Sequence, residues 1–271
     1  MSRKPVIVLT PGAWHSPEHF QDLRDELHTR GWETRVVRHQ SVGSEPPNKG
    51  LYDDAAATGA VLQELADQDR QIVLVAHSYG GLAAAEGVKG FGIKQRAAEG
   101  KPGGVIMFMY LAAFVGQKGQ SILSMTGDVY PPWTRVEVSE SFSCLACDAW
   151  YTDQIRQDGR IHVVTADDPL YGDVPSEARE KAKSLLKHQT TISFKETMTY
   201  EPWHDITCMY VGCEDDQAIP YFAQEQMQQL LGPEATKLKL KSAHSPFLSV
   251  LSETADAVEL AAKKGLEALS V

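Results

Sequence analysis

The sequence predicts an α/β fold in which a mostly parallel sheet is flanked by helices and carries an inserted cap. Short apolar runs rich in β-branched residues alternate with longer amphipathic stretches, which is the pattern of βα repeats. The interval 116–204 has a different texture, with a Pro-Pro pair and many aromatic residues. A length of 271 residues suits one core with an insertion. We therefore predict a core formed by 1–115 and 205–271, and a cap formed by 116–204.

Each core element follows from its periodicity. Six short apolar runs are predicted as strands: Val6–Thr10, Glu33–Val37, Gln71–Ala76, Gly104–Ala112, Thr207–Gly212 and Thr236–Lys241. Five stretches with apolar residues at helical spacing are predicted as helices: Pro17–Gly31, Asp53–Gln68, Ser78–Gly87, Ile219–Leu231 and Ser252–Leu269. In the cap, Pro175–His188 is predicted as a helix. The β-branched stretches Ile161–Thr165 and Thr190–Thr199 could form a small sheet.

Charge and composition limit the classes of molecule that the protein is expected to bind. The sequence has 26 Lys and Arg residues and 36 Asp and Glu residues, and the resulting net charge of −10 disfavours binding to nucleic acids and anionic membranes. We expect a small, uncharged substrate. No apolar run approaches the length of a membrane span, and the start of the chain lacks a signal-peptide pattern, so we expect a cytoplasmic protein. The sequence does not predict an oligomeric state.

No metal or other cofactor is expected. Cys144 and Cys147 have the spacing of a metal-binding or redox pair, but no second such pair or nearby histidine pair completes a zinc site. We interpret these cysteines as thiols in the packing of the cap.

The motif Ala76-His77-Ser78-Tyr79-Gly80-Gly81 lies between a predicted strand and a predicted helix. This is the context of a nucleophile elbow, a strained turn that exposes the hydroxyl of its serine and needs small residues two positions away on each side. Ala76 and Gly80 meet that requirement, although the usual first glycine is alanine here. Ser78 is therefore the predicted nucleophile.

A serine hydroxyl needs a base, and the base needs a carboxylate that orients it. His244 follows the last predicted strand, where it can lean back over the sheet, and is the predicted base. Asp216 is the predicted carboxylate because its segment, Asp216-Gln217-Ala218-Ile219-Pro220, resembles the acid loop of folds with this strand pattern, in which a proline opens the next helix four residues later. Asp215 is the alternative.

Three other histidines are given different roles. His77 should point away from the Ser78 hydroxyl into the core, and His204 should lie where the chain enters a strand. His15 lies near the predicted oxyanion loop, where it would contact either substrate or solvent.

Backbone N–H groups are predicted to stabilise the oxyanion. One comes from Tyr79, the residue after the nucleophile. The other comes from Ala13, because Gly12 allows the sharp turn that points this amide inward.

Large aromatic residues are the candidates for contact with an apolar substrate. Trp14 and Tyr79 are favoured by their positions beside the predicted oxyanion donors and nucleophile. Further aromatic residues fall in or beside the cap: Tyr130, Trp133, Phe142, Trp150, Tyr151, Tyr171 and Trp203. Of these, Trp133, Tyr171 and Trp203 are predicted to bind substrate.

Together these motifs resemble the esterase and hydroxynitrile-lyase branch of the α/β-hydrolase superfamily, which includes plant methyl-salicylate esterases and microbial relatives. The matching segments are VLTPGAW, VAHSYGG, DDPLYGDVP, MYVGCEDDQAIP and HSPFLS, and the chain order Ser, Asp, His is that of this fold. Pro11 replaces the family's usual histidine. The resemblance implies an α/β-hydrolase fold, a largely helical cap and an apolar substrate tunnel.

The preferred function is hydrolysis of a carboxylic ester or lactone of a small apolar or aromatic substrate through an acyl-enzyme. An alternative is lyase-type carbon–carbon cleavage at the same residues, for which the branch uses a cap lysine. The cap contains four candidate lysines: Lys181, Lys183, Lys187 and Lys195. A second alternative is a small-molecule receptor. Epoxide hydrolases and dehalogenases are disfavoured because they would need Asp in place of Ser78.

Overall fold

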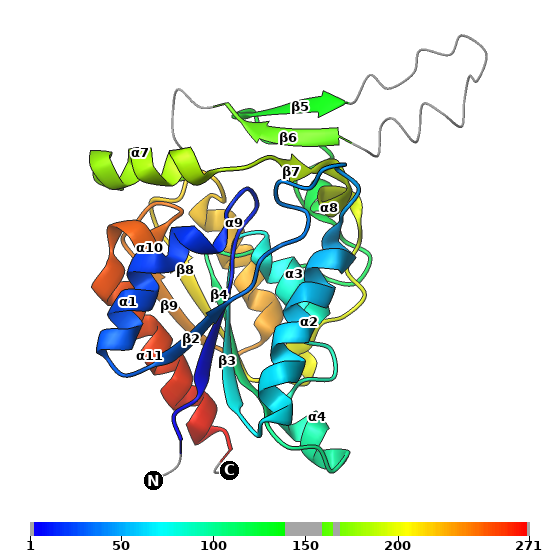
Figure 1. Ribbon diagram of the computed structural model, residues 1–271, viewed down its shortest axis with the longest axis vertical. Helices are drawn as coiled ribbons and strands as arrows, with labels where there is room; N and C mark the ends of the chain where they lie inside the picture. Colours follow the sequence, from blue (N-terminus) through cyan, green and yellow to red (C-terminus); the bar gives the residue numbers. More distant parts are fainter. Residues whose placement is uncertain (1–2, 139–158, 165–168, 270–271) are drawn as a thin grey trace, which may run out of the picture.

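A six-stranded parallel sheet forms the centre of the computed structural model, which describes residues 3–138, 159–164 and 169–269 (Figure 1). The strand order is β2-β1-β3-β4-β8-β9, and all five pairings are parallel. The strands are β1 (Val6–Thr10), β2 (Glu33–Val36), β3 (Gln71–His77), β4 (Gly104–Leu111), β8 (Cys208–Cys213) and β9 (Thr236–Leu240). All six strands predicted from the sequence are confirmed, with ends that shift by no more than one residue.

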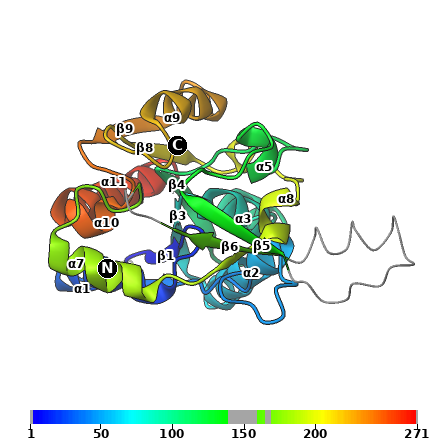
Figure 2. The same ribbon diagram turned by 90° about the horizontal axis from the view of Figure 1, so that it is seen from above.

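Helices cover both faces of this sheet. On one face lie α1 (Gln21–Thr29) and α11 (Leu251–Glu267), and on the other α2 (Leu51–Asp67), α3 (Gly80–Gly87) and α9 (Tyr221–Met227) (Figures 1 and 2). Shorter helical segments complete the core: η1 (Pro17–Phe20), α4 (Ile93–Ala98), η2 (Pro202–His204), η3 (Gln228–Leu231) and α10 (Pro246–Ser249). The α/β class is confirmed, and the five helices predicted for the core are present with ends that shift by up to four residues.

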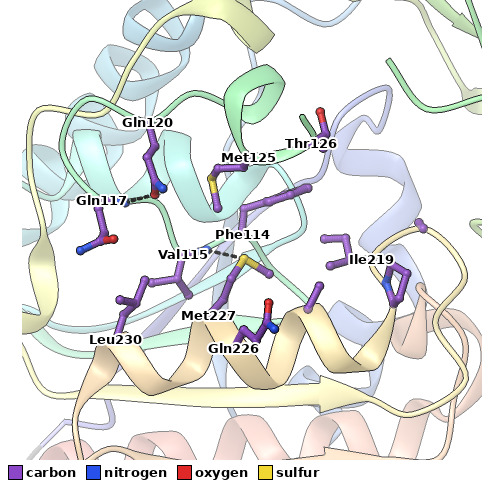
Figure 3. Close-up of a pocket in the computed structure, with 13 residues that line it drawn as sticks. Phe114, Val115, Gln117, Gln120, Met125, Thr126, Ile219, Gln226, Met227 and Leu230 are labelled. Atoms are coloured by element: carbon purple, nitrogen blue, oxygen red, sulfur yellow. Dashed lines mark hydrogen bonds between the residues drawn. The ribbon is translucent and has the colours of Figure 1, made fainter. Parts of the chain in front are cut away.

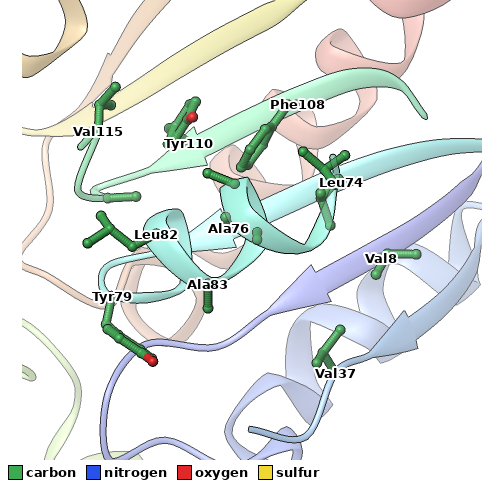
Figure 4. Close-up of a cluster of buried hydrophobic side chains, with 14 of the residues drawn as sticks. Val8, Val37, Leu74, Ala76, Tyr79, Leu82, Ala83, Phe108, Tyr110 and Val115 are labelled. Atoms are coloured by element: carbon green, nitrogen blue, oxygen red, sulfur yellow. The ribbon is translucent and has the colours of Figure 1, made fainter. Parts of the chain in front are cut away.

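Alternate strand residues fill two separate apolar layers. Val8, Leu74 and Phe108 pack toward α2 and α3 (Figure 4). Their neighbours Ile7 and Val73 pack toward α1 and α11. Because helices cover both faces, the central strands are apolar along their whole length rather than at every second residue.

Residues between β4 and β8 form a second, three-stranded antiparallel sheet. Its strands are β5 (Thr134–Val138), β6 (Gly159–Val163) and β7 (Gln189–Thr190), and it lies beyond the carboxyl ends of the central strands (Figure 1). The described part of this segment also contains α5 (Ile122–Met125), α7 (Ser176–Leu185) and α8 (Thr191–Lys195). The resemblance implied a largely helical cap, and the structure adds this sheet to the helices.

One predicted strand of the insertion is largely wrong. Of the stretch Thr190–Thr199, only Thr190 belongs to a strand, and the following residues form α8. The side chain of Ser193 donates to the carbonyl of Thr190 at 2.7 Å, and both residues are buried. Local hydrogen bonding and burial therefore override the β-propensity of the sequence.

Among the described residues, no helix has both the length and the apolar character needed to cross a bilayer.

Candidate active site

Ser78 lies in a sharp turn between β3 and α3. Its φ of 55° falls in the left-handed region, which is uncommon for a residue with a Cβ atom and places strain at the turn. A Cβ atom on Gly80 would lie 2.3 Å from the carbonyl oxygen of Pro11, so the turn can approach the oxyanion loop only with glycine at this position. The backbone has the form that the motif predicted.

The structure brings the three predicted catalytic side chains into one hydrogen-bond chain. The Ser78 hydroxyl lies 2.9 Å from Nε2 of His244, and Nδ1 of His244 lies 2.7 Å from Oδ2 of Asp216. A carboxylate only accepts hydrogen bonds, so the imidazole carries its proton on Nδ1 and Nε2 is free to accept from Ser78. All three side chains are buried.

Asp216, rather than Asp215, faces the imidazole. Its Oδ1 accepts from the backbone N–H groups of Ala218 and Ile219, each at 2.8 Å, and its Oδ2 also accepts from Nε2 of Gln224 at 2.9 Å. Asp215 is exposed on the same loop. Sequence reasoning missed Gln224, for which the only signal was a polar residue at an inward position of a predicted helix.

The histidines next to the site have structural partners. His77 donates from Nε2 to the backbone carbonyl of His244 at 2.8 Å, which agrees with its predicted place in the core. His15 is buried, donates from Nδ1 to the carbonyl of Ala13 at 2.7 Å and accepts from the Tyr171 hydroxyl at 2.8 Å. His204 is exposed in η2, just before β8.

Burial lowers the pKa of three histidines around the site. Loss of solvent is the main cause that lowers the pKa of both His15 and His77 well below the ordinary histidine value, and the pKa of His19 is lowered for the same reason. Neighbouring imidazoles further lower the pKa of His15, whose ring centre is 4.5 Å from that of His19 and 5.8 Å from that of His77.

The residues of the two predicted oxyanion donors, Ala13 and Tyr79, line the space next to Ser78. Within the described part of the chain, the backbone N–H groups of Ala13 and Tyr79 donate to no other group. The next residue, Trp14, has a φ of 64°, and its backbone N–H donates to Oε1 of Gln189 at 3.2 Å. A Cβ atom on Gly12 would lie 2.9 Å from the Cβ atom of Ser78, so this loop packs directly against the nucleophile.

A buried polar network behind these donors was not predicted. The Tyr79 hydroxyl donates to Oδ2 of Asp54 at 2.7 Å, and both the backbone N–H and the hydroxyl of Ser41 donate to the same carboxylate. Gln189 in turn donates to the Ser41 hydroxyl at 2.6 Å. Burial and the Asp54 carboxylate raise the pKa of Tyr79 well above its usual value, so its hydroxyl keeps its proton. The network joins α2, the elbow and the insertion.

A narrow cavity of about 40 Å³, named here the Ser78 cavity, opens onto the Ser78 and His244 side chains. Of the predicted substrate-binding residues, Trp14, Tyr79 and Trp133 line it, and Trp14 packs edge-on against Trp133 with ring centres 5.2 Å apart. The remaining walls are mostly apolar: Phe114, Ile122, Pro131, Leu170, Phe194, Ala218 and Ile219.

Tyr171 and Trp203 are not brought to the Ser78 cavity. Tyr171 is fully buried, and its hydroxyl is used by His15. Trp203 belongs to η2 and lines a separate hollow at the start of β8, which is the opposite end of the sheet from Ser78. Phe142, Trp150, Tyr151, Cys144 and Cys147 lie outside the described residues.

The candidate lysines of the lyase hypothesis also lie elsewhere. Lys181 lines a shallow hollow beside Glu18 and Asp22, and Lys183 and Lys187 line another beside His162. Neither these three nor Lys195 is among the described residues that line the Ser78 cavity.

Comparison with known proteins agrees with this geometry. A sequence model of the alpha/beta hydrolase family matches residues 7–259. Alpha/beta hydrolase nvfD of Aspergillus novofumigatus is 30% identical over 249 residues, covering 91% of this chain and 92% of that protein. A pyrethroid hydrolase of Sphingobium wenxiniae is 23% identical over 262 residues, covering 93% of this chain and 85% of that protein. The crystal structure of polyneuridine aldehyde esterase superimposes with a TM-score of 0.71 at 14% identity, over 94% of this chain and 98% of that one. The chain therefore belongs to the alpha/beta hydrolase family.

Proposed function

We propose that the protein is a serine hydrolase that cleaves a carboxylic ester or lactone of a small apolar or aromatic substrate. The observation that carries the proposal is the hydrogen-bond chain from Ser78 through His244 to Asp216. Relatives named as an esterase and a pyrethroid hydrolase support ester cleavage as the reaction. The aromatic walls of the Ser78 cavity favour an apolar substrate.

The reaction begins when Oγ of Ser78 attacks the ester carbonyl carbon while its proton moves to Nε2 of His244. The carbonyl oxygen takes the negative charge and accepts from the N–H groups of Ala13 and Tyr79. The bond to the alcohol oxygen breaks as His244 returns the proton to that oxygen. Water then gives a proton to His244 and attacks the acyl carbon, which releases the acid and restores Ser78. Asp216 stabilises the imidazolium in both steps.

The test compares wild type with Ser78→Ala on a panel of short, long and aromatic esters and lactones, with acid release as the readout. Ser176→Ala is the matched control, because Ser176 is exposed at the start of α7. We expect Ser78→Ala to lower kcat at least about a thousandfold and the control to retain it. Equal rates for wild type and Ser78→Ala would refute the mechanism.

The lyase alternative receives less support. The described walls of the Ser78 cavity carry no lysine near which a leaving group could be held, and the segments 139–158 and 165–168 contain no lysine in their sequence.

A further inference from the structure

A second hollow adjoins the Ser78 cavity. It has a volume of about 380 Å³ and runs between α5 and α9, where it is bounded by Val115, Met125, Ala223, Met227 and Leu230 (Figure 3). We call it the α5–α9 groove. Pockets for small molecules are typically ~300–1,000 Å³, and a cavity needs only ~10–15 Å³ to hold a water. The Ser78 cavity therefore has room for a few waters, whereas the groove has room for part of a substrate.

The cavity and the groove adjoin each other, because four residues line both. Phe114, Thr126, Ala218 and Ile219 line both. Phe114 is fixed to the elbow, since its backbone N–H donates to the carbonyl of Ser78 at 3.1 Å. Ala218 and Ile219 are fixed to the carboxylate of Asp216 by their backbone N–H groups. The wall between the two spaces is thus fixed by hydrogen bonds to the backbone of Ser78 and to the carboxylate of Asp216.

The walls of the groove are apolar and adaptable. Met125 from α5 and Met227 from α9 lie on opposite sides, with Phe114 between them (Figure 3). Both methionines are half-buried. Such side chains can adjust to an occupant because their unbranched chains have several rotatable bonds. Met227 also accepts a hydrogen bond from the backbone N–H of Val115 at 3.5 Å, which ties the floor of the groove to the end of β4.

The polar residues at the groove are uncharged. Gln117, Gln120 and Gln226 form its polar part with Thr126, and none of the described lining residues is Asp, Glu, Lys, Arg or His. A charged occupant would lose its hydration here without gaining a partner. The chain's net charge of −10 further disfavours an anionic one.

We propose that the α5–α9 groove is a substrate subsite that binds an uncharged, extended apolar arm of the ester. The inference rests on the proposed function and names the substrate class. The Ser78 cavity of about 40 Å³ leaves little room beyond an ester carbonyl at Ser78, and the groove, which shares four of its wall residues, is a neighbouring space with room for the longer arm. The arm belongs to either the acid or the alcohol, and the experiment separates these two sources.

Two substrate series are compared on wild type by acid release: methyl esters of straight-chain acids from acetate to decanoate, and acetates of straight-chain alcohols from methyl to decyl. We expect kcat/KM to rise by about two- to fourfold per methylene in one series, as expected for burial of part or all of each added group. The series that responds identifies the arm. A terminal carboxylate on the longest responding ester should reduce kcat/KM by at least about tenfold.

Variants of residues that line the groove also test whether it binds the apolar arm of the ester. Ala223→Phe fills the groove, and Met125→Gln keeps a similar side-chain length while adding polarity. Each should lower the ratio of kcat/KM for the longest responding ester to that for its shortest homologue by at least about tenfold. This ratio does not depend on how much of a variant folds. Gln229→Phe, on an exposed position of η3 outside the groove, should leave the ratio unchanged.

The outcomes separate the two proposals. If wild type hydrolyses short esters but neither series gains with length, the groove assignment is wrong and the proposed function stands. The groove assignment is also wrong if both groove variants retain the ratio of wild type. If wild type cleaves a lactone but no ester, only the groove assignment is overturned. If it cleaves neither, both proposals are overturned.

Discussion

Three fully buried tyrosines offer a matched test of how the polar network behind Ser78 contributes to stability. Tyr79 donates its hydroxyl to the Asp54 carboxylate at 2.7 Å, and Tyr210 donates to the Ala113 carbonyl at 2.9 Å. The Tyr110 hydroxyl is buried with no partner among the described residues. Tyr→Phe removes the same atom at each position, so differences between the three variants report the partner and not the volume.

The expected losses in the free energy of unfolding follow from these partners. Tyr79→Phe should cost about 1.5–3 kcal/mol, because a buried hydrogen bond to a carboxylate is lost. Tyr210→Phe should cost about 0.5–1.5 kcal/mol, the usual contribution of a neutral hydrogen bond. Tyr110→Phe should cost nothing or stabilise the protein, since it removes a buried group that lacks a partner.

Urea unfolding followed by circular dichroism measures the three values on one scale. Only the order Tyr79, Tyr210, Tyr110, from largest to smallest loss, is consistent with the reasoning. Equal losses at all three positions would mean that the hydroxyl partners do not set the cost, and a large loss for Tyr110→Phe would mean that its hydroxyl has a partner.

Three further predictions concern the pH dependence of stability, the role of Asp216 in catalysis and the role of Gln189 in the insertion. The free energy of unfolding should be highest above about pH 6.5 and fall as the pH is lowered from there, because the unfolded chain takes up protons at histidines whose folded pKa is depressed. Each such histidine contributes a slope of up to about 1.4 kcal/mol per pH unit. Urea unfolding at pH 7.5, 6.5 and 5.5 measures this slope. The histidines concerned are His15, His19 and His77. Stability that stays flat over this range would contradict their burial as neutral groups. Asp216→Asn should lower kcat on the best ester by about 10³–10⁴-fold, whereas Asp215→Asn on the same loop should have little effect, and the reverse order would move the role to Asp215. Gln189→Met should lower kcat by about tenfold or more with a smaller change in KM, because Gln189 positions the proposed oxyanion loop. The exposed control variant Gln63→Met should retain both kcat and KM. A change in KM alone would show that Gln189 does not position this loop.

The sequence was most informative where one local pattern decides the structure. Apolar runs such as Gln71–Ala76 had to become central strands, because a run without polar alternation must be buried on both faces. The small residues around Ser78 and the loop positions of His244 and Asp216 are likewise local signals. The structure places these three side chains in contact without any long-range information having been used to select them.

The parts that the sequence did not predict depend on contacts between distant segments. Asp54 and Gln189 lie 135 positions apart in the chain, and nothing near either one indicates that both bond to Ser41. Trp203 was placed at the site because it is aromatic and adjoins the cap. The short η2 instead holds it at the opposite end of β8.

The insertion does not only cover the site, because it also forms hydrogen bonds that hold the loop containing the Ala13 amide. Three hydrogen bonds join it to Trp14: Trp14 N–H donates to Oε1 of Gln189 at 3.2 Å, the indole N–H donates to the carbonyl of Ile161 at 2.8 Å, and the Lys187 N–H donates to the Trp14 carbonyl at 3.1 Å. The left-handed conformation of Trp14 costs roughly 1–3 kcal/mol, which three bonds of about 1 kcal/mol each can offset. Without them, we expect Trp14 to relax and to move the neighbouring Ala13 N–H, the proposed oxyanion donor. The geometry of this loop is therefore coupled to the docking of the insertion.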